Sequence, residues 1–355
     1  MNPILVSSTE ESTGKTAVAL ALARHAAEGG KTVGYMKPKG TRLQSAVGKT
    51  LDQDPMLARE LLDLDEQMHE MEPIVYSPTF VQEAVRGRED VDALHESVTD
   101  NYATVADGKD AVVIEGADEY TTGGIIDLTD PDMADLLDAR VLLIANYDEP
   151  ADLDEVLAAA EAFGDRLGGV LFNAVSDAEF DELTEDAIPF LEARGVTVFG
   201  AIPEVQELSG VTVGELADEL GADVLTGEAP TDAYVERFLV GAMGREAALS
   251  GFRRAREAAV ITGGDRSEIQ TAALGAPGVK CLLLTGGHRP SGAVLGRAEE
   301  AGKPILLVQG DTRTTIDRAE AVVRSGRTRD PQTVERMGDL LADAVDVEGL
   351  LALGA

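Results

Sequence analysis

The chain alternates short, continuously apolar runs with longer amphipathic stretches, and no other feature constrains its fold as strongly. The runs that predict buried strands in the first part of the chain are Ile4–Val6, Thr32–Tyr35, Ala111–Ile114, Val141–Ile144, Gly169–Phe172 and Val196–Phe199. Helical patterns lie between several of them, at Lys15–Glu28, Asp152–Arg166 and Asp181–Arg194. Continuously apolar strands separated by helices are typical of a parallel sheet whose two faces are both covered. The sequence therefore predicts an α/β fold with a mostly parallel sheet and helices on both faces.

A second set of elements follows Pro203. It comprises a predicted helix at Thr212–Leu220 and predicted strands at Asp223–Thr226, Ala258–Ile261, Lys280–Leu284 and Ile305–Val308. One domain typically takes about 100–200 residues, so a chain of 355 residues suggests two. We expect a first domain over residues 1–207 and a smaller α/β domain over residues 212–350.

The composition restricts the partners of the protein. Aspartate and glutamate number 65 against 30 for lysine plus arginine, which gives a net charge of −35. Acidic residues spread along the chain favour solubility at high salt, as in proteins of salt-loving organisms, although a basic partner is an alternative. Nucleic-acid binding is not expected, because phosphate contacts need clustered lysine and arginine. With no run of about 18 apolar residues, no basic signal sequence and one cysteine, Cys281, we expect a cytoplasmic protein without a membrane span.

The segment after the first predicted strand has the context of a phosphate-binding loop. It runs from Ser7 to Thr16, ends in Gly14-Lys15-Thr16 and leads into a helix. In such a loop Lys15 reaches the β- and γ-phosphates, and the hydroxyl of Thr16 binds Mg²⁺. Thr9 stands where the usual first glycine would be. The alternative is an ordinary helix start capped by Ser12 or Thr13.

Charged residues follow two other predicted strands. Lys37 comes after the second strand, and Glu115 with Gly116 comes at the end of the third. Ligands of open α/β sheets bind at the carboxyl ends of strands. Lys37 is therefore predicted to stabilise a phosphoryl group or to hold an acidic substrate, and Glu115 to bind Mg²⁺ or to orient water. Asp52 and Asp54 could complete the metal site. A surface lysine, a solvent-facing glutamate and a solvated acidic pair are the alternatives.

These segments together resemble dethiobiotin synthetase and the related amide-forming enzymes of cobyrinic acid synthesis. They are also similar to the domain that precedes the catalytic part of some bacterial phosphotransacetylases. The resemblance implies that Asn173, at a strand end, contacts the nucleotide base and that the stretch Gly200–Glu204, with Pro203, closes the domain. It implies catalytic roles for Lys15, Lys37 and Glu115, and Mg²⁺ ligation by Thr16, Asp54 and Glu115. The predicted nucleotide-binding residues are Thr9, Glu10, Ser12, Thr13, Gly14, Lys15, Thr16, Ala17, Asn173 and Pro203.

The second half resembles the DRTGG domain that accompanies such a P-loop domain. The resemblance is carried by Thr262–Arg266, Leu284–Gly287 and Gly310–Arg313. Arginines near these glycine turns suit an unknown small anionic ligand, whereas a purely structural role for the turns and for Asp265 and Arg266 is the alternative. No zinc site is expected.

Two departures limit the resemblance. Glu10 and Glu11 replace the Asp and Thr of the synthetase loop, which makes biotin synthesis doubtful. The sequence ends at Ala355, so we expect it to lack the acetyl-transferring part of a phosphotransacetylase.

Two functional hypotheses remain open. The first is a Mg²⁺- and ATP-dependent enzyme, either an ATPase or a ligase. The second is a nucleotide-sensing regulatory module that acts on a separate enzyme of acetyl-phosphate or acetyl-CoA metabolism. A nucleotide-free structural protein is a third alternative. We expect ATP rather than GTP, because Asn173 lacks the N-K-x-D context of guanine readers. The resemblance implies a homodimer.

Overall fold

The computed structural model describes residues 3–41, 43–46, 49–205, 208, 210–227, 229–241, 251–252, 254–326 and 331–354. The chain forms two compact units. The first contains residues 1–205 and 328–355, and the second contains residues 206–327. The second unit is therefore inserted in the sequence of the first.

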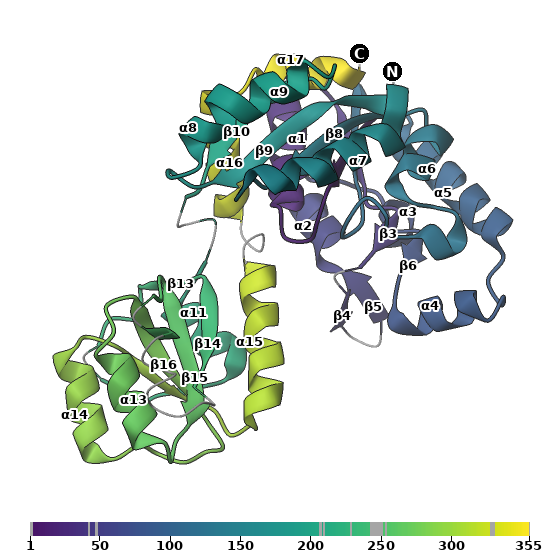
Figure 1. The fold of residues 1–355 in the computed structure, drawn as a ribbon. Coiled ribbons are helices and arrows are strands. Elements are labelled where there is room, and N and C mark those ends of the chain that lie inside the picture. The colour runs from purple at the N-terminus through teal and green to yellow at the C-terminus, as the bar shows by residue number, and fades with distance from the viewer. Residues whose placement is uncertain are drawn as a thin grey trace. The chain divides into compact units, whose positions relative to one another are not determined.

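The first unit is built on a six-stranded sheet in which all neighbouring strands are parallel (Figure 1). The strand order is β10-β9-β8-β1-β7-β2. Their bounds are β1 Ile4–Ser8, β2 Val33–Met36, β7 Ala111–Glu115, β8 Arg140–Ala145, β9 Leu167–Val175 and β10 Val198–Pro203. The parallel sheet predicted from the apolar runs is confirmed.

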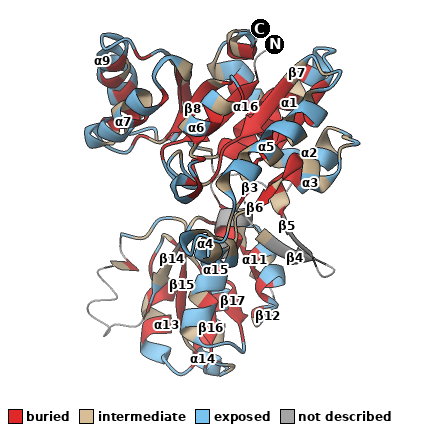
Figure 2. Cartoon of the chain, turned by 90° about the vertical axis from the view of Figure 1, so that its right-hand side faces the viewer, coloured by how far each residue is buried: buried red, intermediate tan, exposed pale blue. Residues whose placement is uncertain are grey.

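Helices cover both faces of this sheet, as the buried inner surfaces in Figure 2 indicate. On one face, apolar residues of the strands pack with Val98 of α5, Met133 of α6 and Val156 of α7. On the other face, α1 packs along β1, β2 and β7. The helix bounds are α1 Lys15–Glu28, α5 Val91–Ala106, α6 Asp130–Leu136 and α7 Leu153–Phe163.

The remaining elements of the first unit are short. Two short strand pairs form outside the main sheet: β3 pairs with β6, and β4 pairs with β5. The bounds are β3 Lys39–Gly40, β4 Leu43–Ala46, β5 Lys49–Asp52, β6 Ile74–Val75, α2 Gln53–Leu61, α3 Met68–Met71, α4 Pro78–Val85, η1 Gly124–Ile126, η2 Pro150–Asp152, η3 Gly164–Arg166, α8 Phe180–Glu182, η4 Leu183–Ala187 and α9 Ile188–Glu192.

The C-terminal helices return to the first unit. They are α16 Pro331–Ala344, α17 Val347–Leu351 and η5 Ala352–Gly354. The buried side of α16, which includes Met337 and Leu341, packs on α1, whose buried face extends along most of its length. Arg24 of α1 also lies 3.6 Å from Glu335. The structure thus differs from the predicted second-domain range 212–350, because the apolar stripe of α16 is buried by the first unit.

The second unit has its own sheet in the order β12-β17-β16-β15-β14. Strands β14 to β17 are parallel to one another, and β12 pairs antiparallel with β17 at the edge. Residues of one face pack with α11 and α15, and residues of the other face pack with α13 and α14. The bounds are β11 Val211–Thr212, α11 Val213–Leu220, β12 Asp223–Val224, β13 Tyr234–Val235, β14 Arg237–Val240, β15 Ala258–Gly263, α13 Ser267–Leu274, β16 Val279–Thr285, α14 Gly292–Glu300, β17 Ile305–Leu307 and α15 Thr312–Gly326. The predicted smaller α/β region is confirmed.

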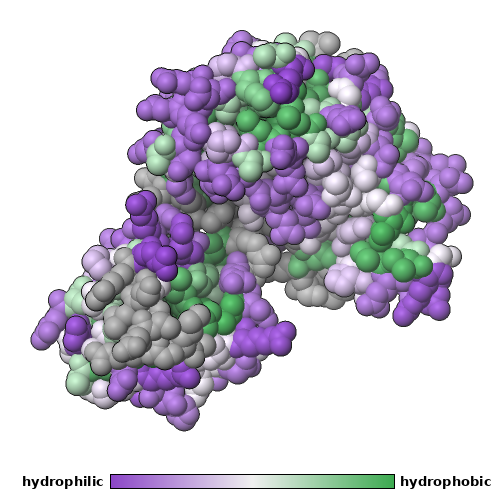
Figure 3. Space-filling model, viewed as in Figure 1, coloured by the Kyte–Doolittle hydropathy of each residue, from purple (hydrophilic) through white to green (hydrophobic). Residues whose placement is uncertain are grey.

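The surface agrees with the acidic composition. The face in Figure 3 is mostly hydrophilic, with smaller apolar patches between the polar residues. Large apolar side chains that are exposed include Val85 and Ile125. None of the described helices is long and apolar enough to cross a membrane.

Candidate functional site

The loop between β1 and α1 combines left-handed backbone with a helix start that has no side-chain cap. Ser12 and Gly14 both adopt left-handed conformations, with φ of 63° and 83°. Gly14 is the N-cap of α1, and no side chain forms a capping hydrogen bond there. The hydroxyl of Thr13 is buried without a hydrogen-bond partner in the described part of the chain. The alternative of an ordinary start capped by Ser12 or Thr13 therefore has no support from these contacts.

Lys15 is buried beneath this loop. Its Nζ donates to Ser8 Oγ at 3.0 Å, to Asp118 O at 3.1 Å and to Ala117 O. Burial lowers the pKa of Lys15, although nearby carboxylates oppose that shift. Because β1 and β7 are adjacent in the sheet, the segment after β7 lies within reach of the first residue of α1.

Thr16 and Glu115 meet directly. Thr16 Oγ1 donates to Glu115 Oε1 at 2.7 Å, and Tyr35 OH donates to Glu115 Oε2 at 2.5 Å. Burial raises the pKa of Glu115, and the charge of Lys37 opposes this effect. The predicted solvent-facing alternative for Glu115 does not match its buried position.

Lys37 lies among three carboxylates. Its Nζ is 3.0 Å from Asp52 Oδ2 and 3.5 Å from Glu115 Oε1, and it also contacts Asp54 Oδ2. Burial alone would lower the pKa of Lys37, but the carboxylates outweigh burial and raise it. Asp52 and Asp54 are both buried at the start of α2, where Asp52 Oδ1 accepts from Asp54 N at 2.8 Å. They are thus not a solvated surface pair.

The oxygens of Thr16 and Glu115 fit a shared Mg²⁺ ion. Neighbouring ligands of octahedral Mg²⁺, each about 2.1 Å from the ion, are separated by about 3 Å, close to the 2.7 Å observed here. Asp54 is instead engaged with Lys37. No group of three or more histidine, cysteine or acidic residues suited to a metal ion occurs within the residues described above. The remaining ligands would therefore be phosphate oxygens and water, as is usual for Mg²⁺ bound with nucleotides.

The other predicted nucleotide-binding residues lie in the loop, in α1 and near the ends of β9 and β10. Thr9 is buried, and its N–H donates to Ile144 O at 3.1 Å. Glu10 is exposed, and its Oε1 accepts from Asn146 Nδ2 at 3.2 Å. Asn173, at the end of β9, donates from Nδ2 to Thr13 O at 2.7 Å. Ala17 is buried within α1, and Pro203 ends β10 opposite Val175.

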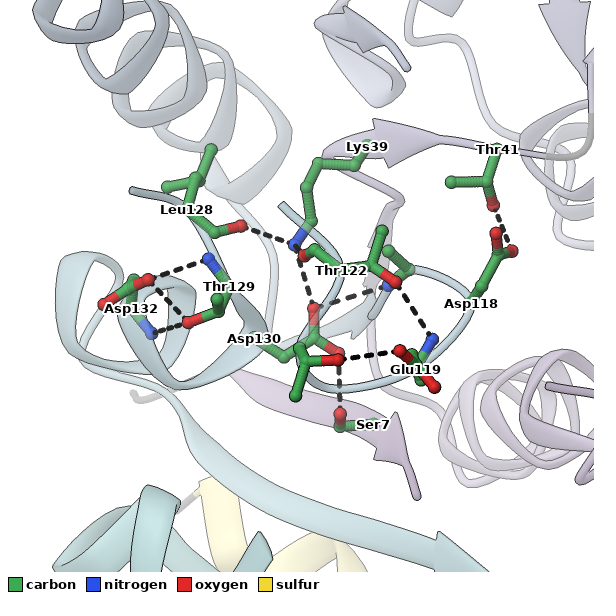
Figure 4. A network of polar contacts seen from close by, with 12 residues as sticks. Ser7, Lys39, Thr41, Asp118, Glu119, Thr122, Leu128, Thr129, Asp130 and Asp132 are labelled. Atoms are coloured by element: carbon green, nitrogen blue, oxygen red, sulfur yellow. Dashed lines mark hydrogen bonds and ion pairs between the residues drawn. The ribbon is translucent and has the colours of Figure 1, made fainter. Parts of the chain in front are cut away.

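A second buried network was not predicted from the sequence (Figure 4). Lys39 Nζ donates to Thr122 O at 2.6 Å, to Leu128 O at 2.5 Å and to Asp130 Oδ1 at 3.2 Å. Asp130 Oδ2 accepts from Ser7 Oγ at 2.6 Å, so this carboxylate joins the end of β1 to the start of α6. The sequence signal available was the pair of lysines that flank Pro38 directly after a buried strand.

Thr41 and Asp118 connect the two sides of the site. Thr41 Oγ1 donates to Asp118 Oδ1 at 2.6 Å, and Thr41 N donates to Asp52 Oδ2 at 2.8 Å. Polar contacts therefore run without a break from Lys15 through Asp118 to the carboxylates around Lys37.

All of the buried charged residues that the structure describes belong to this region. They are Lys15, Lys37, Lys39, Asp52, Asp54, Glu72, Glu115 and Asp130. Burying charge is costly unless it is paired, and such groups concentrate at functional sites. The cluster around the loop is therefore the strongest candidate for a functional site in the described residues.

The glycine turns of the second unit lie at the carboxyl ends of its parallel strands. A Cβ on Gly264 would collide with His288 O, so the turns after β15 and β16 approach closely. Arg266 Nη1 donates to Gly241 O at 2.9 Å, and Thr285 Oγ1 lies 2.8 Å from Thr312 Oγ1. Asp265, His288 and Arg289 are exposed.

Comparison with protein families agrees with this arrangement. Residues 2–212 match the model of the AAA_26 family, an AAA domain. The chain belongs to the AAA_26 family. Residues 215–322 of this AAA_26 protein match the DRTGG domain. The resemblance inferred from the P-loop and DRTGG motifs is thereby confirmed.

Phosphate acetyltransferases are similar along nearly the whole chain. The Pseudomonas putida enzyme is 26% identical over 99% of this chain and 51% of its own length. The Nitratidesulfovibrio vulgaris enzyme is 26% identical over 89% of this chain and 46% of its own length. The AAA_26 protein thus spans about half the length of the curated relatives it matches.

Among solved structures, MinD of Aquifex aeolicus overlaps with 59% of this chain and 84% of its own, at 17% identity and a TM-score of 0.36. The CBS and DRTGG domains of Clostridium perfringens pyrophosphatase, solved with diadenosine tetraphosphate, overlap with 40% of this chain and 69% of their own. Their identity is 20% and the TM-score is 0.28.

Proposed function

We propose that this AAA_26 protein binds ATP with Mg²⁺ in the cytoplasm and acts as an ATPase or an ATP-dependent ligase. The observation that carries the proposal is the gathering of the buried charged residues, among those that the structure describes, around one loop and the strand ends beside it. A polyphosphate would supply the negative charge that buried lysines and an uncapped helix start can stabilise. Lys15 would exchange its carbonyl partners for phosphate oxygens.

Each predicted residue has a role in this proposal. Thr16 and Glu115 would hold Mg²⁺, which polarises the phosphoryl group when bound. Lys37 would stabilise charge on the transferring phosphoryl group, with its side chain held in place by Asp52 and Asp54. The loop residues Thr9 to Thr16 would surround the phosphates. Asn173 and Pro203 would lie beside the base of the nucleotide.

The second candidate is a nucleotide-sensing regulatory module. It is favoured by the insertion of the second unit between residues 205 and 328 of the first, so that both of its ends join the nucleotide unit. The returning helix α16 packs on α1, which begins at the phosphate loop. In this case the second unit would bind a small anionic ligand. Binding of the nucleotide and of this ligand would regulate a separate enzyme of acetyl-phosphate or acetyl-CoA metabolism. The protein itself would act as a homodimer.

Thermal unfolding in concentrated KCl tests the nucleotide proposal. Because a ligand that binds only the folded state stabilises it, Mg–ATP should raise the unfolding midpoint of the wild type. It should not raise that of Lys15→Ala. The exposed Lys31→Ala variant is the matched control and should respond like the wild type. A midpoint that no tested nucleotide changes would overturn the proposal.

Phosphate release separates the two candidates. An ATPase or ligase should release phosphate from ATP in a Mg²⁺-dependent reaction that Lys37→Met and Glu115→Gln slow by at least about 100-fold. A sensor should bind ATP without turnover. Binding with no phosphate release, alone or with candidate carboxylate and amine substrates, would favour the regulatory module.

A further inference from the structure

We propose that Asn173 is a positioning residue that holds the phosphate loop in its anion-binding shape. This inference rests on the proposed nucleotide function and adds a role that is independent of the base. Asn173 is 5% exposed and lies at the end of β9. In the sheet, β9 is separated from β1 by β8, so Asn173 reaches the loop from a different part of the chain.

The chemistry of the contact fixes the orientation of the amide. Thr13 O can only accept a hydrogen bond, so the atom of Asn173 that lies 2.7 Å away must be the donor Nδ2. A trans peptide is planar, and its C=O and N–H point in opposite directions. By drawing the Thr13 carbonyl towards β9, Asn173 turns the N–H of Gly14 to the opposite side of the loop.

The loop backbone is suited to this arrangement. Successive N–H groups can converge on an anion where right-handed and left-handed residues alternate, and here Ser12 and Gly14 are left-handed. Gly14 also leaves room for the amide, because a Cβ at this position would collide with Asn173 Nδ2. The contact between Asn173 and the loop therefore requires a glycine at position 14.

A bulge in β9 lies next to Asn173 and directs its side chain. Phe172 pairs with Ala201 and Val175 pairs with Pro203, so β9 has one more residue than β10 between these pairs. Within this bulge Ala174 adopts a φ of 55°, which is unfavourable for a residue with a Cβ. Bulges commonly redirect a side chain next to a functional site. Here the redirected side chain is Asn173, which contacts the loop.

A polyphosphate without a base separates positioning from base recognition. Binding of Mg–tripolyphosphate and Mg–ATP is measured by calorimetry for the wild type, Asn173→Ala and Asn173→Asp. Loss of one hydrogen bond should weaken tripolyphosphate binding by about 10-fold in Asn173→Ala. Asn173→Asp keeps the shape but places a carboxylate against Thr13 O, so the loss should be larger. ATP binding should weaken at least as much.

Asn101→Ala is the matched control, because Asn101 Nδ2 also donates to a main-chain carbonyl, Ser97 O, at 2.7 Å, but on α5. It should leave the affinity for both ligands unchanged. Unchanged tripolyphosphate binding in the Asn173 variants, with weaker ATP binding, would overturn the inference and leave a base contact alone. Wild-type binding of ATP but not of tripolyphosphate would also contradict it. If the wild type binds neither ligand, the proposed nucleotide function itself fails.

Discussion

Glu72 provides a pH-dependent test of the buried site. Its Oε2 accepts from Asp52 N at 2.9 Å, whereas its buried Oε1 has no hydrogen-bond partner in the described part of the chain. Burial raises the pKa of Glu72 from 4.5 to about 7. The hydrogen bond from Asp52 N and the charge of Lys37 oppose this shift, whereas the carboxylates of Asp52 and Asp54 add to it. The folded state therefore holds the proton of Glu72 more tightly than the unfolded state.

This difference in proton affinity makes the free energy of unfolding depend on pH. Between pH 4.5 and about 7 the folded state binds more protons, so the free energy of unfolding falls as the pH rises. At about 1.4 kcal/mol per pKa unit, a rise from 4.5 to about 7 corresponds to about 3.5 kcal/mol, nearly all of which is lost by pH 8. Glu72→Gln has the shape of the protonated acid and escapes this loss. The variant should exceed the wild type in stability by less than about 1 kcal/mol at pH 5 and by about 3.5 kcal/mol at pH 8.

Urea unfolding at pH 5 and pH 8, at one KCl concentration, measures the difference. Glu192→Gln, at an exposed glutamate that ends α9, controls for the removal of one negative charge from a highly acidic protein. An equal difference between wild type and Glu72→Gln at the two pH values would refute the reasoning. So would a variant that is less stable than the wild type at pH 8.

Three further results are expected. Gly14→Ala should abolish Mg–ATP binding, because alanine disfavours the φ of 83° and its Cβ would collide with Asn173. Calorimetry measures the affinity, and wild-type affinity in this variant would contradict the loop geometry. Lys39→Met should lower the free energy of unfolding, measured in urea, by about 3–5 kcal/mol, because the buried Asp130 loses its ion pair. A loss below about 1 kcal/mol would contradict the structural importance of this ion pair. Cys281 should resist a thiol reagent until the protein unfolds, because burial raises its pKa to about 12; rapid labelling of the folded protein would contradict its core position.

The central strands could be predicted from the sequence because they bury both faces. In β16, Cys281 and Leu283 enter one core, and Leu282 and Leu284 enter the other. A continuously apolar run is the direct consequence. The phosphate loop was also predictable, since its residues are contiguous and its strand and helix flank it.

The buried networks required the structure. Lys39 binds Leu128 O and Asp130, which are 89 and 91 residues away, and no local pattern identifies such partners. Asp52 and Asp54 could not be distinguished from the many surface acids until α2 placed them beside Lys37. The helix α16 has a visible apolar stripe, but a stripe does not specify which unit will bury it.

The central claim is that the loop around Gly14-Lys15-Thr16 binds the phosphates of ATP. Calorimetric titration of Mg–ATP into the wild type and Lys15→Ala, both first shown to be folded, tests it most directly. The account predicts one site per chain with micromolar affinity for the wild type and a loss of at least about 100-fold in Lys15→Ala. Equal affinity in the two proteins would place the nucleotide elsewhere and contradict the account.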